Sequence, residues 1–196
     1  MNGKTTEEWR ILLSRLNESV FASEEWKARL SPEGLATRWC GGPPATPEEI
    51  LAEEKRLGMP LPPSYRAFLS ASNGWELFGS FVEFLLPVQD IDWFGNADPE
   101  GLAGIFEYQD DNTSDEDYLD YDTPEHMVAM RPRYYPDCLL VGGVWMSKEN
   151  MILLNSKIVS PDGEWEAIFF ADWVPGNRRY RSFYDLAQKH PEFLRV

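Results

Sequence analysis

One stretch of this sequence, EYQDDNTSDEDYLDYD at residues 107–122, gathers the side chains best suited to binding or chemistry. Eight of its residues are Asp or Glu and three are Tyr. Three uses are open for such a stretch: oxygen ligands for a metal ion, a solvated loop, or a surface that receives a positively charged partner. We distinguish these uses by the spacing of the acids and by the charge of the remaining chain.

The spacing argues against a metal site. A calcium loop needs oxygen ligands in regular alternation, a turn-forming Gly and a distal Glu, and DDNTSDEDYLDYD has neither the Gly nor the alternation. Cys40 and Cys138 are too few for a cysteine site, and we expect both to be buried and reduced rather than joined in a disulfide. The sequence therefore predicts no metal and no cofactor.

The charge of the chain is concentrated around this stretch. The 196 residues include 18 Lys and Arg against 33 Asp and Glu, which gives a formal net charge of −15. No Lys or Arg occurs from Ala67 to Met130, a window that holds fifteen acids, whereas the remaining sequence holds as many bases as acids. Such a surface repels the phosphates of nucleic acids and anionic membranes and attracts a basic protein.

We predict that the acidic stretch binds a basic partner protein. Carboxylates steer such a partner into contact, and tyrosines supply the kind of side chain that dominates interface hot spots. A solvated loop without a partner is the alternative, and the sequence leaves it open. In both cases we expect the stretch to be largely dispensable for folding. The residues predicted to bind are Glu107, Tyr108, Asp110, Asp111, Asp115, Glu116, Asp117, Tyr118, Asp120, Tyr121 and Asp122.

Signals of catalysis or of membrane insertion are weak. His126 and His190 are the only histidines, and no G-x-S-x-G, phosphate-binding loop or H-E-x-x-H motif occurs. No apolar run reaches the length of a membrane-spanning helix, and the N-terminus lacks the apolar core of a signal peptide. The sequence predicts a non-enzymatic protein in the cytoplasm.

Periodicity and caps predict the elements that must position the acidic stretch. Thr46, Pro47 and Glu49 form a predicted capping box for a helix that ends at Gly58. GGPPA at 41–45 indicates a linker before it. We expect helices at about 6–20, 46–57, 63–73 and from 182, and strands at 81–86, 139–145, 150–155 and 164–170. This order predicts the α+β class, with N-terminal helices on a mainly antiparallel sheet and a C-terminal helix that closes the domain.

Several segments resemble the SUKH superfamily, which includes bacterial immunity proteins and a fungal regulator of cell-wall assembly. They are TPEEILAEEKRLGMPLPPSYRAFLSASNGW, LLVGGVWMSKENMILLNS, EWEAIFFADW and SFYDLAQ. The resemblance implies an α+β domain at 46–196, with an acidic insertion at about 98–133 and an N-terminal helical extension at 1–45. We expect a chain without residues 1–40 to fold cooperatively.

The resemblance also implies a protein that binds rather than catalyses. Bacterial members of the superfamily neutralise toxins, often nucleases, by covering them, and a nuclease offers the basic surface that an acidic partner attracts. We therefore expect an immunity protein against a basic, nuclease-type toxin. The alternative is a regulatory adaptor or scaffold of the fungal cell-wall regulator type.

Overall fold

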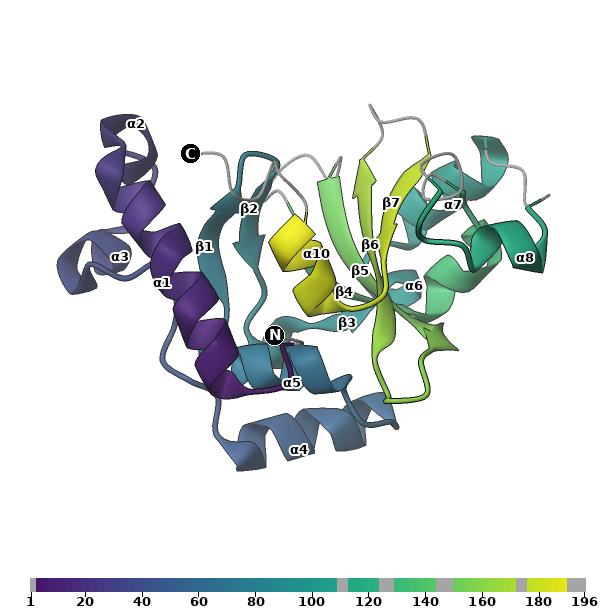
Figure 1. Cartoon of the computed structure of the whole chain (residues 1–196), viewed down its shortest axis with the longest axis horizontal. Coiled ribbons are helices and arrows are strands. Elements are labelled where there is room, and N and C mark those ends of the chain that lie inside the picture. The colour runs from purple at the N-terminus through teal and green to yellow at the C-terminus, as the bar shows by residue number, and fades with distance from the viewer. Residues whose placement is uncertain (1–2, 109–112, 124–128, 144–149, 172–175, 190–196) are drawn as a thin grey trace.

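The computed structural model describes residues 3–108, 113–123, 129–143, 150–171 and 176–189, and it shows helices around one mainly antiparallel sheet (Figure 1). The helices are α1 (Thr6–Ala22), α2 (Glu24–Lys27), α3 (Pro32–Thr37), α4 (Pro47–Leu57), α5 (Pro63–Leu69), α6 (Phe94–Ala97), α7 (Pro99–Tyr108), α8 (Asp115–Tyr118) and α10 (Phe183–Lys189), with 3-10 turns η1 (Val88–Asp90) and η2 (Pro132–Asp137). The α+β class with a closing C-terminal helix is confirmed. None of the described helices combines the length and apolar character needed to cross a bilayer.

The helix boundaries follow from local capping chemistry. The Glu49 N–H donates to Thr46 Oγ1 at 3.2 Å, and the Thr46 N–H donates to Glu49 Oε2 at 2.7 Å, so the predicted capping box is confirmed. Gly58 then adopts φ +79°, a left-handed conformation that Gly reaches without steric cost, and α4 ends there. Ser182 begins α10 in a similar way, because its Oγ accepts the Asp185 N–H at 3.0 Å.

The sheet has the strand order β1-β2-β4-β5-β6-β7, and β3 pairs separately with β4. Its strands are β1 (Trp75–Gly79), β2 (Val82–Leu85), β3 (Asp92–Trp93), β4 (Cys138–Gly143), β5 (Asn150–Val159), β6 (Trp165–Ala171) and β7 (Asn177–Tyr180). The predicted antiparallel succession of β4, β5 and β6 is confirmed. The sequence analysis missed β1, β3 and β7. The strand β3 has only two residues, and β7 reads Asn-Arg-Arg-Tyr, without apolar alternation.

One face of the sheet supports the larger core, under α1, α5 and α10. Trp165, Ala167 and Phe169 of β6 point into this core, as expected for alternate residues of a strand. The ring of Trp9 in α1 lies 5.2 Å from the rings of Phe68 in α5 and Phe183 in α10, measured between centroids. The N-terminal helix is therefore part of the central packing of the domain.

The segment predicted as a linker is also fixed to the domain. Gly41 forms a bridge to Trp75, the first residue of β1. The Ala45 N–H donates to the Leu69 carbonyl at 2.9 Å, and Ala45 itself is buried. Because α1 and residues 41–45 both join the main packing, position 45 does not divide the hydrophobic core.

The opposite face of the sheet carries a second core, covered by α6, α7 and η2. Phe94, Ile105 and Tyr135 pack there with strand residues that include Leu153 and Ile168. In Figure 1, α7 and α8 lie at the right-hand end of the molecule and α1–α3 at the left-hand end. The region predicted as an insertion at 98–133 thus forms part of a layer over this second face.

Candidate protein-binding surface

The described part of the acidic stretch, residues 113–123, is shaped by its own side chains. Ser114 Oγ accepts the Asp117 N–H at 3.1 Å and donates to Asp117 Oδ2 at 2.8 Å, which caps the short helix α8. Asp120 then holds a turn: its Oδ1 accepts the N–H groups of Asp122 at 2.8 Å and Thr123 at 3.2 Å. We call residues 113–123 the acidic segment.

Four of the predicted binding residues lie partly or wholly outside the described structure. Glu107 and Tyr108 end α7, but their side chains are outside the described residues. Asp110 and Asp111 lie outside them altogether. The predicted role of these four residues stays a prediction.

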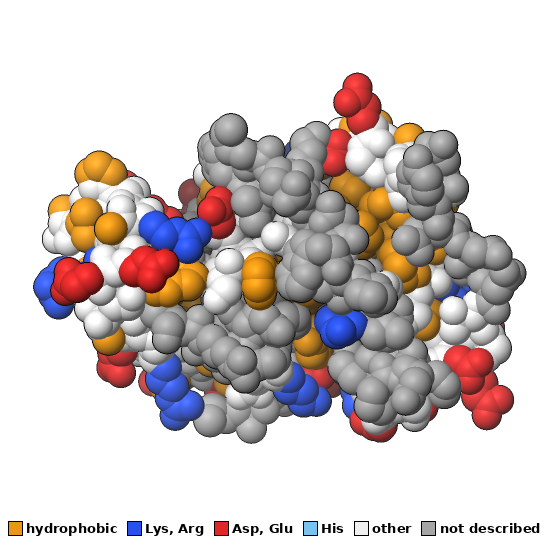
Figure 2. Space-filling view, turned by 90° about the horizontal axis from the view of Figure 1, so that it is seen from above, with side chains coloured by type: hydrophobic (Ala, Val, Ile, Leu, Met, Phe, Trp, Pro, Cys, Tyr) orange, Lys and Arg blue, Asp and Glu red, His pale blue; other side chains and the backbone are white. Residues whose placement is uncertain are grey.

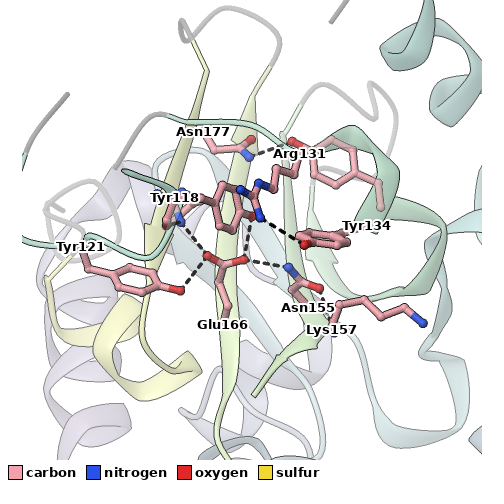
Figure 3. A network of polar contacts seen from close by, with 10 residues as sticks. Tyr118, Tyr121, Arg131, Tyr134, Asn155, Lys157, Glu166 and Asn177 are labelled. Carbon is pink, nitrogen blue, oxygen red and sulfur yellow. Dashed lines mark hydrogen bonds and ion pairs between the residues drawn. The ribbon is translucent and has the colours of Figure 1, made fainter. Parts of the chain in front are cut away.

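Two tyrosines of the acidic segment converge on one carboxylate, that of Glu166 (Figure 3). Tyr118 donates its hydroxyl hydrogen to Glu166 Oε2 at 2.9 Å, and Tyr121 donates to Glu166 Oε1 at 2.9 Å. Tyr118 has no exposed surface, and Tyr121 is partly buried. Tyr118 therefore fastens the segment to the sheet and does not lie on the surface as an anchor for a partner.

Glu166 occupies this position because of the alternation of β6. Its neighbours Trp165 and Ala167 face the larger core, so Glu166 faces the second side of the sheet, where it is 1% exposed. Its carboxylate also accepts hydrogen bonds from Asn155 Nδ2 at 2.8 Å and Arg179 Nη1 at 2.9 Å. A buried carboxylate is tolerated only when it is paired and hydrogen-bonded in this way.

Arginines from elsewhere in the sequence hold the aromatic ring and backbone of Tyr118. The guanidinium of Arg179 lies 3.9 Å from the ring centroid, and its Nη1 also donates to the Tyr118 carbonyl. The guanidinium of Arg131 lies 4.3 Å from the same ring centroid, and its Nη2 donates to the Thr113 carbonyl at 2.9 Å. Cation–π contacts of this kind are strongest where the groups are desolvated.

Two further ion pairs join the acidic segment to distant bases. Arg131 Nη2 lies 2.6 Å from Asp115 Oδ1. Arg181 donates from Nη1 and Nη2 to the two carboxylate oxygens of Asp122, at 3.2 and 3.0 Å.

The window without Lys or Arg is thus isolated from bases along the chain but not in space. Two of its acids, Asp115 and Asp122, pair with Arg131 and Arg181, which the fold brings from outside the window. The complete burial of Tyr118 and its hydrogen bond to Glu166 argue against the expectation that the acidic stretch is dispensable for folding, which stays a prediction.

Burial keeps the hydrogen-bond donors of this network protonated. Desolvation raises the pKa of Tyr118 and of Tyr121, and the nearby charge of Glu166 raises each further. Both hydroxyls therefore remain donors at physiological pH.

Burial also raises the pKa of the Cys40 thiol to about 12 and that of the Cys138 thiol well above its ordinary value. Both cysteines are free and buried, as predicted.

The outer side of the acidic segment faces solvent. Asp115, Glu116, Leu119 and Asp122 are exposed, and Leu119 retains 52% of its accessible surface. Figure 2, a view from above, shows acidic side chains that project from the end of the molecule where Figure 1 places α8. This outer side combines charge, which can steer a partner, with an apolar side chain, which can add contact area.

The described residues contain no cluster of three or more Asp, Glu, His or Cys placed to hold a metal ion. His126 and His190 lie outside the described residues.

The sequence analysis missed Glu166 and Arg179, which organise the site. One signal was available for Glu166: it is the one charged residue of the otherwise apolar run WEAIFFA at 165–171, and a charge inside a strand that is buried on both faces must find a partner.

A comparison with models of protein families identifies the family of this chain. The model of the SMI1 / KNR4 family (SUKH-1) matches residues 44–195. A search of curated proteins returned no match. The family match begins close to the capping box of α4 and includes every strand of the sheet, together with the acidic segment. Because it covers more than half of the chain, the protein belongs to the SMI1 / KNR4 family (SUKH-1).

Proposed function

We propose that this protein binds and neutralises a basic, nuclease-type protein toxin, with the outer side of the acidic segment as part of the contact surface. Membership of the SMI1 / KNR4 (SUKH-1) family supports the proposal, because proteins of this family are commonly immunity proteins. A nuclease that binds the phosphates of nucleic acids has a basic surface, and a carboxylate-rich surface attracts it.

The observation that carries the proposal is the attachment of the acidic segment to the sheet through Tyr118 and Glu166. A mobile acidic loop would lose conformational entropy on binding, at a cost of about 0.5–1.5 kcal/mol for each immobilised side chain. The buried tyrosine removes part of that cost, because the backbone is already fixed before the partner arrives. The backbone that carries the exposed carboxylates is thus already in place.

The contacts of the acidic segment change which of its residues are expected to steer a partner and which to contact it. Arg131 and Arg181 compensate part of the charge of Asp115 and Asp122, so Glu116 is left to contribute more to steering. Leu119, exposed and next to the buried Tyr118, takes the role of apolar contact that the tyrosines were expected to play. Substitution of Tyr118 is then expected to weaken binding through loss of the segment's structure rather than through loss of a direct contact.

Co-expression tests this proposal. The toxin should be the basic C-terminal domain of a large secreted protein encoded directly upstream. We expect that domain to arrest bacterial growth, co-expression of this protein to restore growth, and the two proteins to elute together in size-exclusion chromatography. Failure to restore growth would contradict the proposal, and a stable complex with a non-toxic basic partner would favour a regulatory adaptor.

A matched pair of variants locates the contact. Glu116→Lys with Leu119→Ala should slow association and abolish protection. Glu48 and Leu51 in α4 have the same spacing and are both exposed, so Glu48→Lys with Leu51→Ala is the control and should protect like wild type. Equal protection by both double variants would move the contact surface away from the acidic segment.

A further inference from the structure

A groove lies at the opposite end of the molecule from the acidic segment. It runs between α1 and α3 on one side and the β1–β2 hairpin on the other, and it encloses a volume of about 1130 Å³. Drug-sized ligands occupy sites of about 300–1,000 Å³. The groove is slightly larger than this range, so it has room for a piece of polypeptide.

The lining of the groove is aromatic and rich in proline. The rings of Trp39 and Trp75 meet edge to face, with centroids 4.9 Å apart. Trp39 is partly exposed, and the neighbouring Pro43 and Pro44 are exposed. Phe84 and Pro87 complete the apolar lining on the other wall. Aromatic grooves of this composition bind polyproline II segments, because flat rings pack well against that extended helix.

One hydrogen-bond donor in the lining has no acceptor. Trp75 is 2% exposed, and its indole Nε1 is buried without a hydrogen-bond partner in the described part of the chain. Buried indole N–H groups usually find an acceptor. A polyproline II segment has no internal hydrogen bonds, so its carbonyl oxygens are free to accept; because the Trp75 Nε1 is buried, it becomes a donor to such a carbonyl only if the indole ring shifts.

The charges around the groove are mainly acidic. Glu33 and Asp90 line it and are exposed, and Glu76 lines it with its carboxylate held by the Ser31 N–H at 3.0 Å and the Ser31 hydroxyl at 2.6 Å. Among the described lining residues, Arg10 is the only base. An occupant with Lys or Arg complements this arrangement.

Beside the groove, the backbone groups at the edge of the sheet already form hydrogen bonds within the chain. The Glu76 N–H donates to the Cys40 carbonyl at 2.7 Å, and Gly41 bridges to Trp75, so residues 40–41 cover the start of β1. The far wall is fixed as well, because Asn73 Oδ1 accepts the Val88 N–H at 2.6 Å. These contacts favour recognition through side chains in a preformed groove over the addition of a further strand.

We propose that this groove binds an extended, proline-containing polypeptide segment that carries Arg or Lys, with its prolines on Trp39 and its basic side chains beside Glu33 and Asp90. The proposal does not depend on the toxin or on the acidic segment, which lies at the other end of the molecule (Figure 1). It assigns the protein a second surface for proteins, specific for extended basic segments.

Fluorescence anisotropy with a labelled peptide of repeated Pro-Pro-Arg tests the proposal. Two control peptides separate the sources of affinity: one replaces Pro with Gly and keeps the charge, and the other replaces Arg with Glu and keeps the conformation. We expect saturable binding of the first peptide only. Equal binding of the glycine peptide would overturn the proposal, because attraction would then rest on charge alone, and so would an absence of saturable binding.

Substitutions in the groove make the test specific. Trp39→Ala should weaken peptide binding roughly thirtyfold, the loss typical of an aromatic hot spot. Because Trp39 also packs on Trp75, a second variant, Glu33→Lys with Asp90→Lys, changes only exposed side chains and should weaken binding about tenfold. The control, Glu25→Lys with Glu48→Lys, reverses two exposed acids outside the groove and should bind like wild type.

The same measurement distinguishes the two proposed surfaces. Glu116→Lys with Leu119→Ala, which should abolish protection against a toxin, should leave peptide affinity unchanged. If the peptide instead responds to Glu116→Lys and not to the groove variants, it binds the acidic segment and the groove proposal is wrong.

Discussion

The two faces of the sheet are filled by different physical means. Under α1, α5 and α10, aromatic side chains such as Trp9, Phe68 and Phe183 pack in a largely apolar core. At one end of the opposite face, Tyr118 and Arg179 meet Glu166 in a buried polar network. Apolar packing is non-directional and depends mainly on shape and area, whereas a buried polar network depends on every member. The first face is therefore stabilised through buried apolar area, and the polar network at one end of the second face fixes the position of one surface segment.

Removal of residues 1–40 should have the largest effect. The sequence alone led us to expect that the remaining chain folds cooperatively, but the place of Trp9, Leu13 and Leu16 in the main core leads us to expect the opposite. Truncation of a single buried aromatic costs about 3–5 kcal/mol, and whole domains have only about 5–15 kcal/mol of stability. Circular dichroism should show no cooperative melting transition.

The exposed face of α1 provides the control for this truncation. Ile11→Ala changes a side chain that is 39% exposed on the same helix and should melt close to wild type. A truncated chain that melts cooperatively would support the predicted boundary of an independent domain at residue 45.

Glu166→Leu should have the next largest effect, because it leaves the buried guanidinium of Arg179 without its carboxylate. Loss of one partner of a buried ion pair costs about 3–5 kcal/mol, whereas replacement of both partners by apolar groups is often close to neutral. Urea unfolding should therefore show that Glu166→Leu with Arg179→Met recovers much of the stability lost in the single variant. A double variant as unstable as Glu166→Leu would show that the hydroxyls of Tyr118 and Tyr121 matter more than the ion pair.

A comparison of Tyr118→Phe with Tyr121→Phe tests whether burial sets the strength of this attachment. Each substitution removes one hydrogen bond to Glu166 and keeps the ring. We expect a loss of about 1–3 kcal/mol at Tyr118, which is fully buried, and about 0.5–1 kcal/mol at Tyr121, where water can replace the missing donor. Equal losses in chemical unfolding would mean that burial does not distinguish the two bonds.

The smallest effect concerns the exposed pair of Asp122 and Arg181. The hydrogen bonds from Arg181 lower the pKa of Asp122, so the folded state holds this carboxylate ionised below its ordinary titration range. The pair therefore stabilises the fold above the unfolded pKa of about 3.9, and its contribution is lost as the pH falls through the lower folded pKa.

NMR titration of the Asp122 carboxyl group measures this effect directly. In Arg181→Gln the pKa of Asp122 should rise toward its ordinary value, because the hydrogen bonds and the charge of Arg181 are lost. An Asp122 pKa that is the same in both proteins would show that the ion pair does not persist in solution.

Local chemistry let the sequence by itself determine much of the fold. The cap of α4 depends on Thr46 and Glu49, which are three residues apart, and the strands β4–β6 follow from apolar runs within each segment. The α+β class follows from the order of these elements. The charge of the acidic stretch was equally plain, because composition does not depend on folding.

Only the tertiary structure decided what the acidic stretch is attached to. Tyr118 and Glu166 are 48 positions apart, and Arg179 reaches the same site from a third segment that sequence patterns did not identify as a strand. Whether a tyrosine in an acidic stretch faces solvent or a buried carboxylate depends on which strands pair and in which register, since a shift by one residue would turn Glu166 to the other face. Sequence determined the elements and their charge, and long-range pairing determined which side chains meet.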